Sequence, residues 1–175
     1  REPMSALKRA DSLIITRADQ VPPQAIAKLD QTITNITGKA PIAHASHQWI
    51  GLLDTQDNEH DLQLLNGKPC SAAIAIGNPA AFGNTLQAHA SDIKDMIIKP
   101  DHHAWPAEEV KAIVEQAKAQ NAIVITTEKD YVKWPKLNAD DPVYRVKLAM
   151  GFSDATEQDM LIEMVQGTLA TDAHR

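Results

Sequence analysis

The motif PDHH, an acid followed by two imidazoles directly after the apolar run 94–99, has the residue types of acid–base chemistry. A carboxylate such as Asp101 can fix the tautomer of a neighbouring imidazole and raise its basicity. His102 and His103 are adjacent in the chain, so both can face one point only if they lie in a loop. The motif therefore suits a general base or the partner of one, while a metal site and an ordinary solvated loop stay open as alternatives.

A metal site at this motif would need more ligands than its surroundings offer. Asp-His-His also occurs in manganese phosphoesterases, which use several further aspartates to hold two metal ions. Here only Asp19 and Asp130 accompany Asp101 at the ends of the expected strands, at weak spacing. The single cysteine, Cys70, is too little for a thiolate zinc site. We therefore expect no metal ligands in this chain.

A second cluster, TTEKD, places hydroxyl, acidic and basic groups where the next apolar run ends. Thr127 is typical of a helix N-cap, and Asp130 three residues later can complete a capping box. This structural role alone accounts for much of the motif. Lys129 offers a second interpretation, contact with an anion, because helix amino-termini favour negative groups.

These motifs need strands that end near one another, and the apolar pattern supplies them. We expect strands near 12–16, 41–47, 71–77, 94–99, 122–126 and 143–148, and a surface excursion or hairpin over 52–69. Helical spacing of apolar residues predicts helices over 24–36, 80–90, 106–120 and 154–170, with Gly38 and Asp154 as caps.

Strands that are continuous apolar runs and alternate with helices predict an α/β fold. We expect a mainly parallel sheet flanked by helices in three layers, α/β/α. In such sheets ligands bind at the carboxyl ends of the strands, where PDHH, TTEKD and the Gly-Asn-Pro turn at 77–79 all fall.

The totals fit one α/β domain over residues 1–175 and exclude several classes. A net charge of −6 argues against a nucleic-acid-binding surface. No apolar run reaches the length of a membrane span, which is roughly 18 to 20 residues. No phosphate loop of the form GxxxxGK[ST] occurs. The chain begins at Arg1 without Met, as an excised piece of a longer protein would.

Several motifs, read in order, resemble one enzyme family. They are REP at 1–3, RADSLIITRAD at 9–19, AIGNPAAFGNTL at 75–86, PDHHAW at 100–105 and ITTEKDYVKW at 125–134. Together they resemble the carboxyl-terminal half of tetraacyldisaccharide 4'-kinase, the lipid A 4'-kinase of Gram-negative bacteria. The resemblance covers nearly all of the chain and is weakest over 48–69 and after 150.

The resemblance implies transfer of the γ-phosphate of ATP to the 4'-hydroxyl of a tetraacyldisaccharide 1-phosphate, which gives lipid IV-A. It also implies Mg²⁺, and a peripheral enzyme on the cytoplasmic face of the inner membrane. The family has a P-loop domain followed by a smaller α/β domain, with the active site between them. This chain resembles the smaller domain, so ATP and Mg²⁺ would be held mainly by the P-loop domain, and we expect the chain alone to be inactive.

The resemblance also implies roles for particular residues. Asp101 and His102 would face the catalytic cleft, and His102 would orient an aspartate base supplied by the P-loop domain. Arg1 would contact a phosphate, and Glu2 would hold a sugar hydroxyl. Residues that match the motifs, and either touch ligand or brace the fold, are His103, Glu128, Lys129 and Asp130.

Two alternatives to a part of a 4'-kinase stay open at this point. The chain could be a non-catalytic module that binds a phosphorylated glycolipid or a partner protein. It could also be a metal phosphoesterase built on PDHH. Tight manganese binding with phosphodiester hydrolysis would favour the latter.

Overall fold

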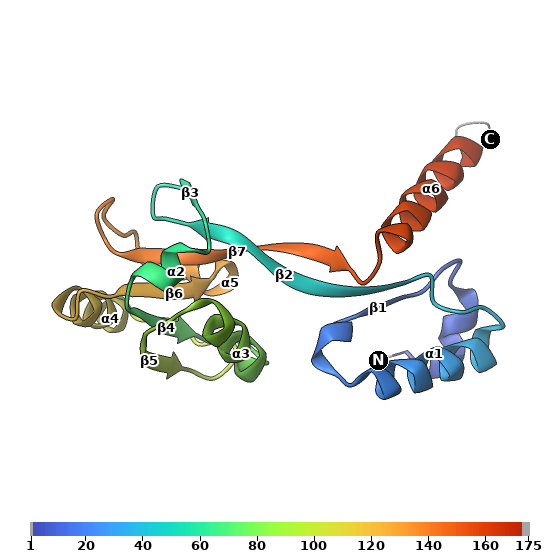
Figure 1. Ribbon diagram of the computed structural model, residues 1–175, viewed down its shortest axis with the longest axis horizontal. Coiled ribbons are helices and arrows are strands. Elements are labelled where there is room, and N and C mark those ends of the chain that lie inside the picture. Colours follow the sequence, from blue (N-terminus) through green and yellow to red (C-terminus); the bar gives the residue numbers. More distant parts are fainter. Residues whose placement is uncertain (1, 173–175) are drawn as a thin grey trace. The chain divides into compact units, whose positions relative to one another are not determined.

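A seven-stranded sheet forms the framework of the chain, with strand order β1-β2-β7-β6-β4-β5 and β3 paired to β2 (Figure 1). The strands are β1 (Ile14–Thr16), β2 (Ala43–Leu53), β3 (Glu59–His60), β4 (Cys70–Ile74), β5 (Ile93–Ile98), β6 (Ile123–Thr127) and β7 (Val143–Phe152). The pairs β1·β2, β4·β5, β4·β6 and β6·β7 are parallel, and β2·β3 is antiparallel. The expectation of a mainly parallel α/β sheet is therefore confirmed.

The computed structural model describes residues 2–172, with side chains through residue 166. Its helices are η1 (Met4–Arg9), η2 (Ala18–Gln20), α1 (Pro23–Thr37), α2 (Leu64–Gly67), α3 (Pro79–His89), α4 (Ala107–Ala119), α5 (Glu128–Tyr131) and α6 (Ala155–Asp172). Gly38 ends α1 in a left-handed conformation with φ 78°, and Asp154 accepts a hydrogen bond from the backbone N of Thr156 at the start of α6. Both caps agree with the sequence pattern.

The contacts divide the chain into two compact units. One comprises Arg1–Gln48 and Met150–Arg175, and the other comprises Trp49–Ala149. The strands β2 and β7 contribute to both units, since each crosses a boundary between them. One domain over 1–175 therefore stays a prediction, because units joined through shared strands can still fold together.

The core of the Trp49–Ala149 unit lies on both faces of its sheet. Along β4, Ala72 and Ile74 point into a cluster with Phe82 and Leu86 of α3. The alternate residues of the same segment point into a second cluster, which contains Ala73, Ala75, Trp105, Val110, Ile113, Val114, Ala117, Val124 and Trp134. Helix α3 therefore covers one face and α4 the other, which is the expected three-layer arrangement.

Three strand ends differ from the sequence pattern by more than two residues. The strand expected over 41–47 continues to Leu53, and the last strand continues to Phe152. Strand β4 ends at Ile74, earlier than expected, because the backbone N of Ala75 donates to the side chain of Asp130 rather than to a neighbouring strand. The excursion after β2 contains the expected hairpin, in which Leu52 lies opposite His60. Among residues 2–172, no helix combines the length and the apolar character that a membrane span requires.

Candidate functional site

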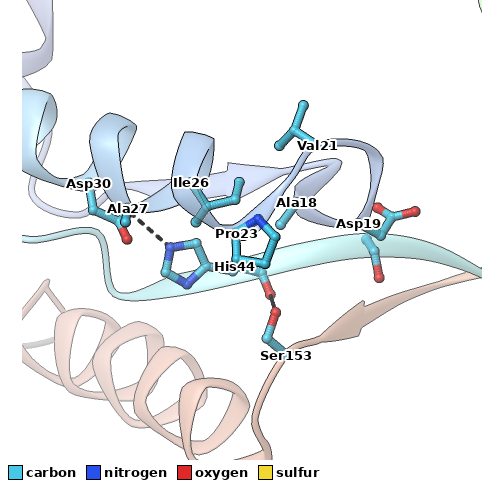
Figure 2. A pocket seen from close by; sticks show the side chains of 10 residues that line it. Ala18, Asp19, Val21, Pro23, Ile26, Ala27, Asp30, His44 and Ser153 are labelled. Carbon is cyan, nitrogen blue, oxygen red and sulfur yellow. Dashed lines mark hydrogen bonds and ion pairs between the residues drawn. The ribbon is translucent and has the colours of Figure 1, made fainter.

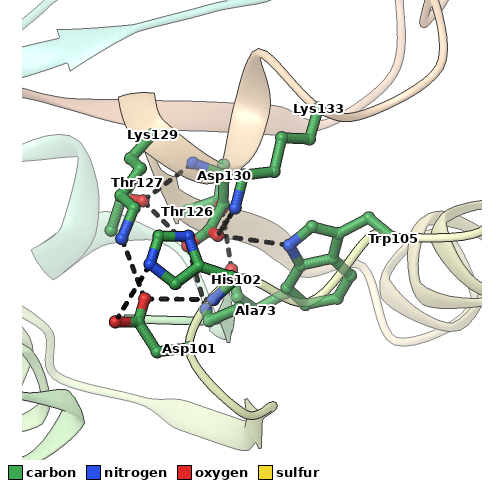
Figure 3. Close-up of polar contacts among 10 residues, drawn as sticks. Ala73, Asp101, His102, Trp105, Thr126, Thr127, Lys129, Asp130 and Lys133 are labelled. Carbon is green, nitrogen blue, oxygen red and sulfur yellow. Dashed lines mark hydrogen bonds and ion pairs between the residues drawn. The ribbon is translucent and has the colours of Figure 1, made fainter. Parts of the chain in front are cut away.

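The carboxyl ends of β4, β5 and β6 bring three loops together in the Trp49–Ala149 unit (Figure 3). The first loop contains Gly77, the second contains Asp101 and His102, and the third begins α5 with Lys129. A Cβ at Gly77 would lie 3.5 Å from Oδ2 of Asp101, so the first two loops are in contact. The parallel pairing of the three strands thus places the motifs at one edge of the sheet.

Asp101 is the centre of the polar contacts at this edge. Its Oδ1 accepts hydrogen bonds from Nζ of Lys129 at 2.8 Å and from the backbone N of His102 at 3.0 Å. The hydrogen bond from Lys129 is the main cause that holds the pKa of Asp101 below its ordinary value, and the charge of His102 acts in the same direction. Asp101 is therefore a carboxylate at neutral pH.

The His102 imidazole is open to solvent beside this carboxylate. Its Nε2 lies 3.7 Å from Oδ2 of Asp101, and its side chain is 77% exposed. Its backbone is left-handed, with φ 67°. This is an uncommon conformation for a residue other than glycine. The ring is thus free to meet a group that the described contacts do not supply.

His103, in contrast, is held by neighbouring side chains. Its Nε2 lies 2.6 Å from Oε2 of Glu109 in α4, and its ring packs edge-on against Trp105 with centroids 5.0 Å apart. Lys99 pairs with the other oxygen of Glu109 at 2.5 Å. The bonds from Lys99 and then His103 lower the pKa of Glu109. His103 therefore ties its loop to the first turn of α4.

Asp130 is fully buried and links all three loops. Its carboxylate accepts hydrogen bonds from the backbone N of Ala75 at 2.9 Å, from Nε1 of Trp105 at 3.2 Å and from Oγ1 of Thr127 at 2.8 Å. Nζ of Lys133 lies 3.9 Å away. Thr127 also caps α5 by accepting from the backbone N of Asp130 at 3.1 Å. The predicted cap is thus present, and the side chain of Asp130 braces the loops.

Glu128 points toward a different partner, Arg145 of β7. Its Oε2 lies 2.5 Å from Nε of Arg145, whose side chain is only 7% exposed. The guanidinium also donates to the carbonyl O of Asp54 at 2.9 Å, pairs with Asp57, and lies 4.6 Å from the ring centroid of Tyr131. Arg145 therefore joins the β2–β3 turn to α5. Sequence reasoning missed Arg145, because its partners are far from it in the chain.

The remaining site candidates lie in the other compact unit or outside the described residues. Arg1 lies outside the described residues. Glu2 is exposed, and its Oε2 accepts a hydrogen bond from Arg9 at 2.9 Å. Within residues 2–172, no group of three or more His, Cys, Asp or Glu side chains could hold a metal ion.

A second polar cluster, which sequence reasoning did not single out, lies in the other unit, and two of its members, His44 and Asp30, line an open pocket there (Figure 2). His44 of β2 lies between two carboxylates, with Nε2 2.9 Å from Asp30 of α1 and Nδ1 3.0 Å from Glu157 of α6. The bond with Asp30 is the main cause that raises the pKa of His44, with Glu157 adding to it against the effect of burial. Burial works to raise the pKa of Glu157, but its bonds with His44 outweigh it and lower that pKa.

We predict a pH-dependent contribution of His44 to stability. The pKa of His44 is raised in the folded protein. The contribution of His44 to stability is therefore fully present below about pH 6.5, and it is lost as the pH rises through the folded pKa. The contribution of Glu157 to stability is fully present above about pH 4.5, and it is lost as the pH falls through the lowered pKa of Glu157. His44→Gln should therefore lower the free energy of unfolding by about 1 kcal/mol near pH 5.5 and by less at pH 8.5.

Urea unfolding at the two pH values measures this difference. His47→Gln is the matched control, because His47 lies on the same strand and is exposed. A cost of His44→Gln that is equal at both pH values would contradict the prediction.

Comparison with known proteins gives a consistent set of relatives. Residues 1–166 match the family model of tetraacyldisaccharide-1-P 4'-kinase. A tetraacyldisaccharide 4'-kinase from Anaeromyxobacter dehalogenans is 36% identical over 135 residues, which are 76% of this chain and 35% of the relative. Another from Desulfatibacillum aliphaticivorans is 31% identical over 171 residues, which are 95% of this chain and 46% of the relative.

One solved structure shares the fold. A crystal structure of LpxK from Aquifex aeolicus in complex with ATP superposes with a TM-score of 0.59 at 20% identity. The match covers 94% of this chain and 45% of that protein. This chain thus spans between about a third and a half of the length of the relatives that it matches.

Proposed function

Because the chain belongs to the tetraacyldisaccharide-1-P 4'-kinase family, we propose that it forms the carboxyl-terminal part of a lipid A 4'-kinase. The whole enzyme transfers the γ-phosphate of ATP to the 4'-hydroxyl of a tetraacyldisaccharide 1-phosphate and gives lipid IV-A. It works as a peripheral protein on the cytoplasmic face of the inner membrane, where this glycolipid is its substrate. The observation that carries the proposal is the family match over residues 1–166.

In this proposal His102 is the catalytic residue of the chain. Its ring is 77% exposed, so an aspartate base from the amino-terminal part of the enzyme can form a hydrogen bond with it. Such a bond orients the base toward the 4'-hydroxyl and tunes its pKa. The carboxylate of Asp101 lies beside the ring, with its Oδ2 3.7 Å from Nε2 of His102, and places a negative charge next to the imidazole. Transfer then depends on the position of the hydroxyl relative to the γ-phosphate.

The other site candidates take different parts. We assign Arg1 and Glu2 to contacts with the substrate, on the strength of the REP motif. His103, Glu128 and Asp130 have bracing roles. His103 pairs with Glu109, and Glu128 pairs with Arg145. Asp130 accepts hydrogen bonds from the backbone N of Ala75 and from the indole of Trp105.

ATP and Mg²⁺ are the cofactors of this proposal, and this segment does not fit them by itself. The sequence has no phosphate loop, and residues 2–172 hold no side-chain group suited to a metal ion. We therefore assign both to the amino-terminal part, as the family resemblance implies.

The proposal is tested with two proteins, the 175-residue chain and a full-length protein that contains it. With labelled ATP and tetraacyldisaccharide 1-phosphate, we expect the full-length protein to give a 4'-phosphorylated product. The 175-residue chain should give none, because it lacks the groups that neutralise the phosphate charge. Transfer by the chain alone would contradict its assigned part. Binding of the glycolipid without transfer by the full-length protein would favour a binding module instead.

A further inference from the structure

We infer that Lys129 is a positioning residue, which fixes the Asp101 carboxylate so that one of its oxygens faces the His102 ring (Figure 3). The catalytic consequence of this contact rests on the proposed function. The contact itself does not depend on the proposed function, because Lys129, Asp101 and His102 all lie within the unit Trp49–Ala149.

The two oxygens of Asp101 have different surroundings. Oδ1 accepts from Nζ of Lys129 at 2.8 Å and from the backbone N of His102 at 3.0 Å. Oδ2 lies 3.7 Å from Nε2 of His102. Two donors on Oδ1 oppose rotation of the carboxylate, because any rotation would break charge-assisted or backbone hydrogen bonds. Oδ2 is thereby kept beside the imidazole.

Lys129 projects from a turn that is held in place on both sides. Before it in the chain, Glu128 pairs with the nearly buried Arg145 at 2.5 Å. After it, Asp130 is fully buried and accepts from the backbone N of Ala75. A long flexible side chain loses less entropy on forming a contact when its backbone is already fixed. The turn therefore gives Lys129 a defined origin from which it reaches the neighbouring loop.

The loop of His102 needs such a contact from outside. Its backbone is left-handed at His102, with φ 67°, and again at Trp105, with φ 52°. Conformations of this kind persist where surrounding contacts determine them. Trp105 is held by its bond to Asp130, and Asp101 is held by Lys129. The loop is thus fixed at two points, one on each side of the two histidines.

Direct binding of a substrate phosphate by Lys129 is the competing role. The Lys129 side chain is 48% exposed, and its ammonium has three N–H donors, of which the bond to Asp101 uses one. The two roles differ in their kinetics. Loss of a positioning contact lowers kcat, whereas loss of a ground-state phosphate contact raises the KM for the glycolipid.

The first experiment does not depend on activity. The pKa of Asp101 is measured by carboxyl NMR titration in the 175-residue chain and in three variants. Lys129→Met should raise this pKa toward its ordinary value, because the hydrogen bond from Lys129 is the main cause of its lowering. Lys129→Arg should keep it low, and Lys136→Met, which removes an exposed lysine seven positions along, should leave it unchanged. An unchanged pKa in Lys129→Met overturns the inference.

The second experiment uses the full-length kinase. Lys129→Met should lower kcat by about 10- to 100-fold, as small displacements of reacting groups do, with both KM values nearly unchanged. Lys129→Arg should recover much of the loss, and Lys136→Met should have normal kinetics. A higher KM for the glycolipid at normal kcat, or wholly normal kinetics, overturns the positioning role. If the unsubstituted protein transfers no phosphate, the proposed function fails, while the titration still decides whether Lys129 holds Asp101.

Discussion

His102→Ala lowers the turnover of the full-length kinase by about 10² to 10⁴ in the expected result, the usual range for a group that takes part in proton transfer. The KM values for ATP and for the glycolipid change little, because the imidazole acts on the base in the transition state and does not hold either substrate. The measurement is kcat and both KM values, together with the midpoint of thermal unfolding for each variant.

Two further variants separate chemistry from loop structure. His102→Asn removes the imidazole and keeps a residue type that tolerates the left-handed backbone at this position, φ 67°. It should lose as much turnover as His102→Ala. His103→Ala removes the contact with Glu109, so it should lower stability and leave kcat nearly normal. Normal turnover in a stably folded His102→Asn protein would remove His102 from the mechanism.

Asp130→Ala has the largest expected effect on stability, a loss of about 3 to 5 kcal/mol in the free energy of unfolding. The substitution leaves two buried donors, the backbone N of Ala75 and Nε1 of Trp105, without their acceptor. It also leaves Lys133 without the carboxylate 3.9 Å away. Unfolding in urea measures the loss through the midpoint at an unchanged slope.

Asp130→Asn provides a milder version of the same test. The amide keeps one acceptor oxygen but places an NH₂ group where the carboxylate meets donors, so the loss should be smaller than for Ala. Asp140→Ala is the matched control on an exposed acid, with an expected change within about 0.5 kcal/mol. A loss below about 1 kcal/mol for Asp130→Ala would contradict the bracing role, because it would mean that the buried donors find other partners.

Much of the fold follows from local pattern. The helix expected over 106–120 is present as α4 (Ala107–Ala119), because its apolar positions recur at helical spacing and its first turn carries two glutamates. The length of β2 does not follow in this way. Gly51 weakens the strand pattern, yet a Cβ there would lie 3.1 Å from the carbonyl O of His60. The glycine therefore allows the close approach of β3, which only the tertiary pairing reveals.

In the candidate site, too, some features follow from the sequence pattern and others depend on tertiary contacts. The order of motifs and strand ends predicts that Asp101, His102 and the TTEKD motif lie at one edge of the sheet, and the three loops do meet there. The different contact partners of the adjacent residues in this motif could not be predicted. Glu128, Lys129 and Asp130 face Arg145, Asp101 and Ala75 in turn, and each partner lies far away in the chain. The same short sequence motif suits a carboxylate that caps a helix and a carboxylate that is buried among donors from distant segments, so the motif alone does not distinguish the two.

The position of β7 in the sheet constrains how the chain can reach its native state. Among the strands of residues 2–172, β7 comes last in the chain, yet it lies between β2 and β6 in the strand order. Until it is present, β1 with β2 and β4 with β5 and β6 are two separate partial sheets, each with an open edge that can pair with another chain. Completing the sheet closes a long stretch of chain, which slows folding. The strand edges that β7 covers in the finished sheet are therefore open to pairing with other chains for as long as residues 143–152 are absent.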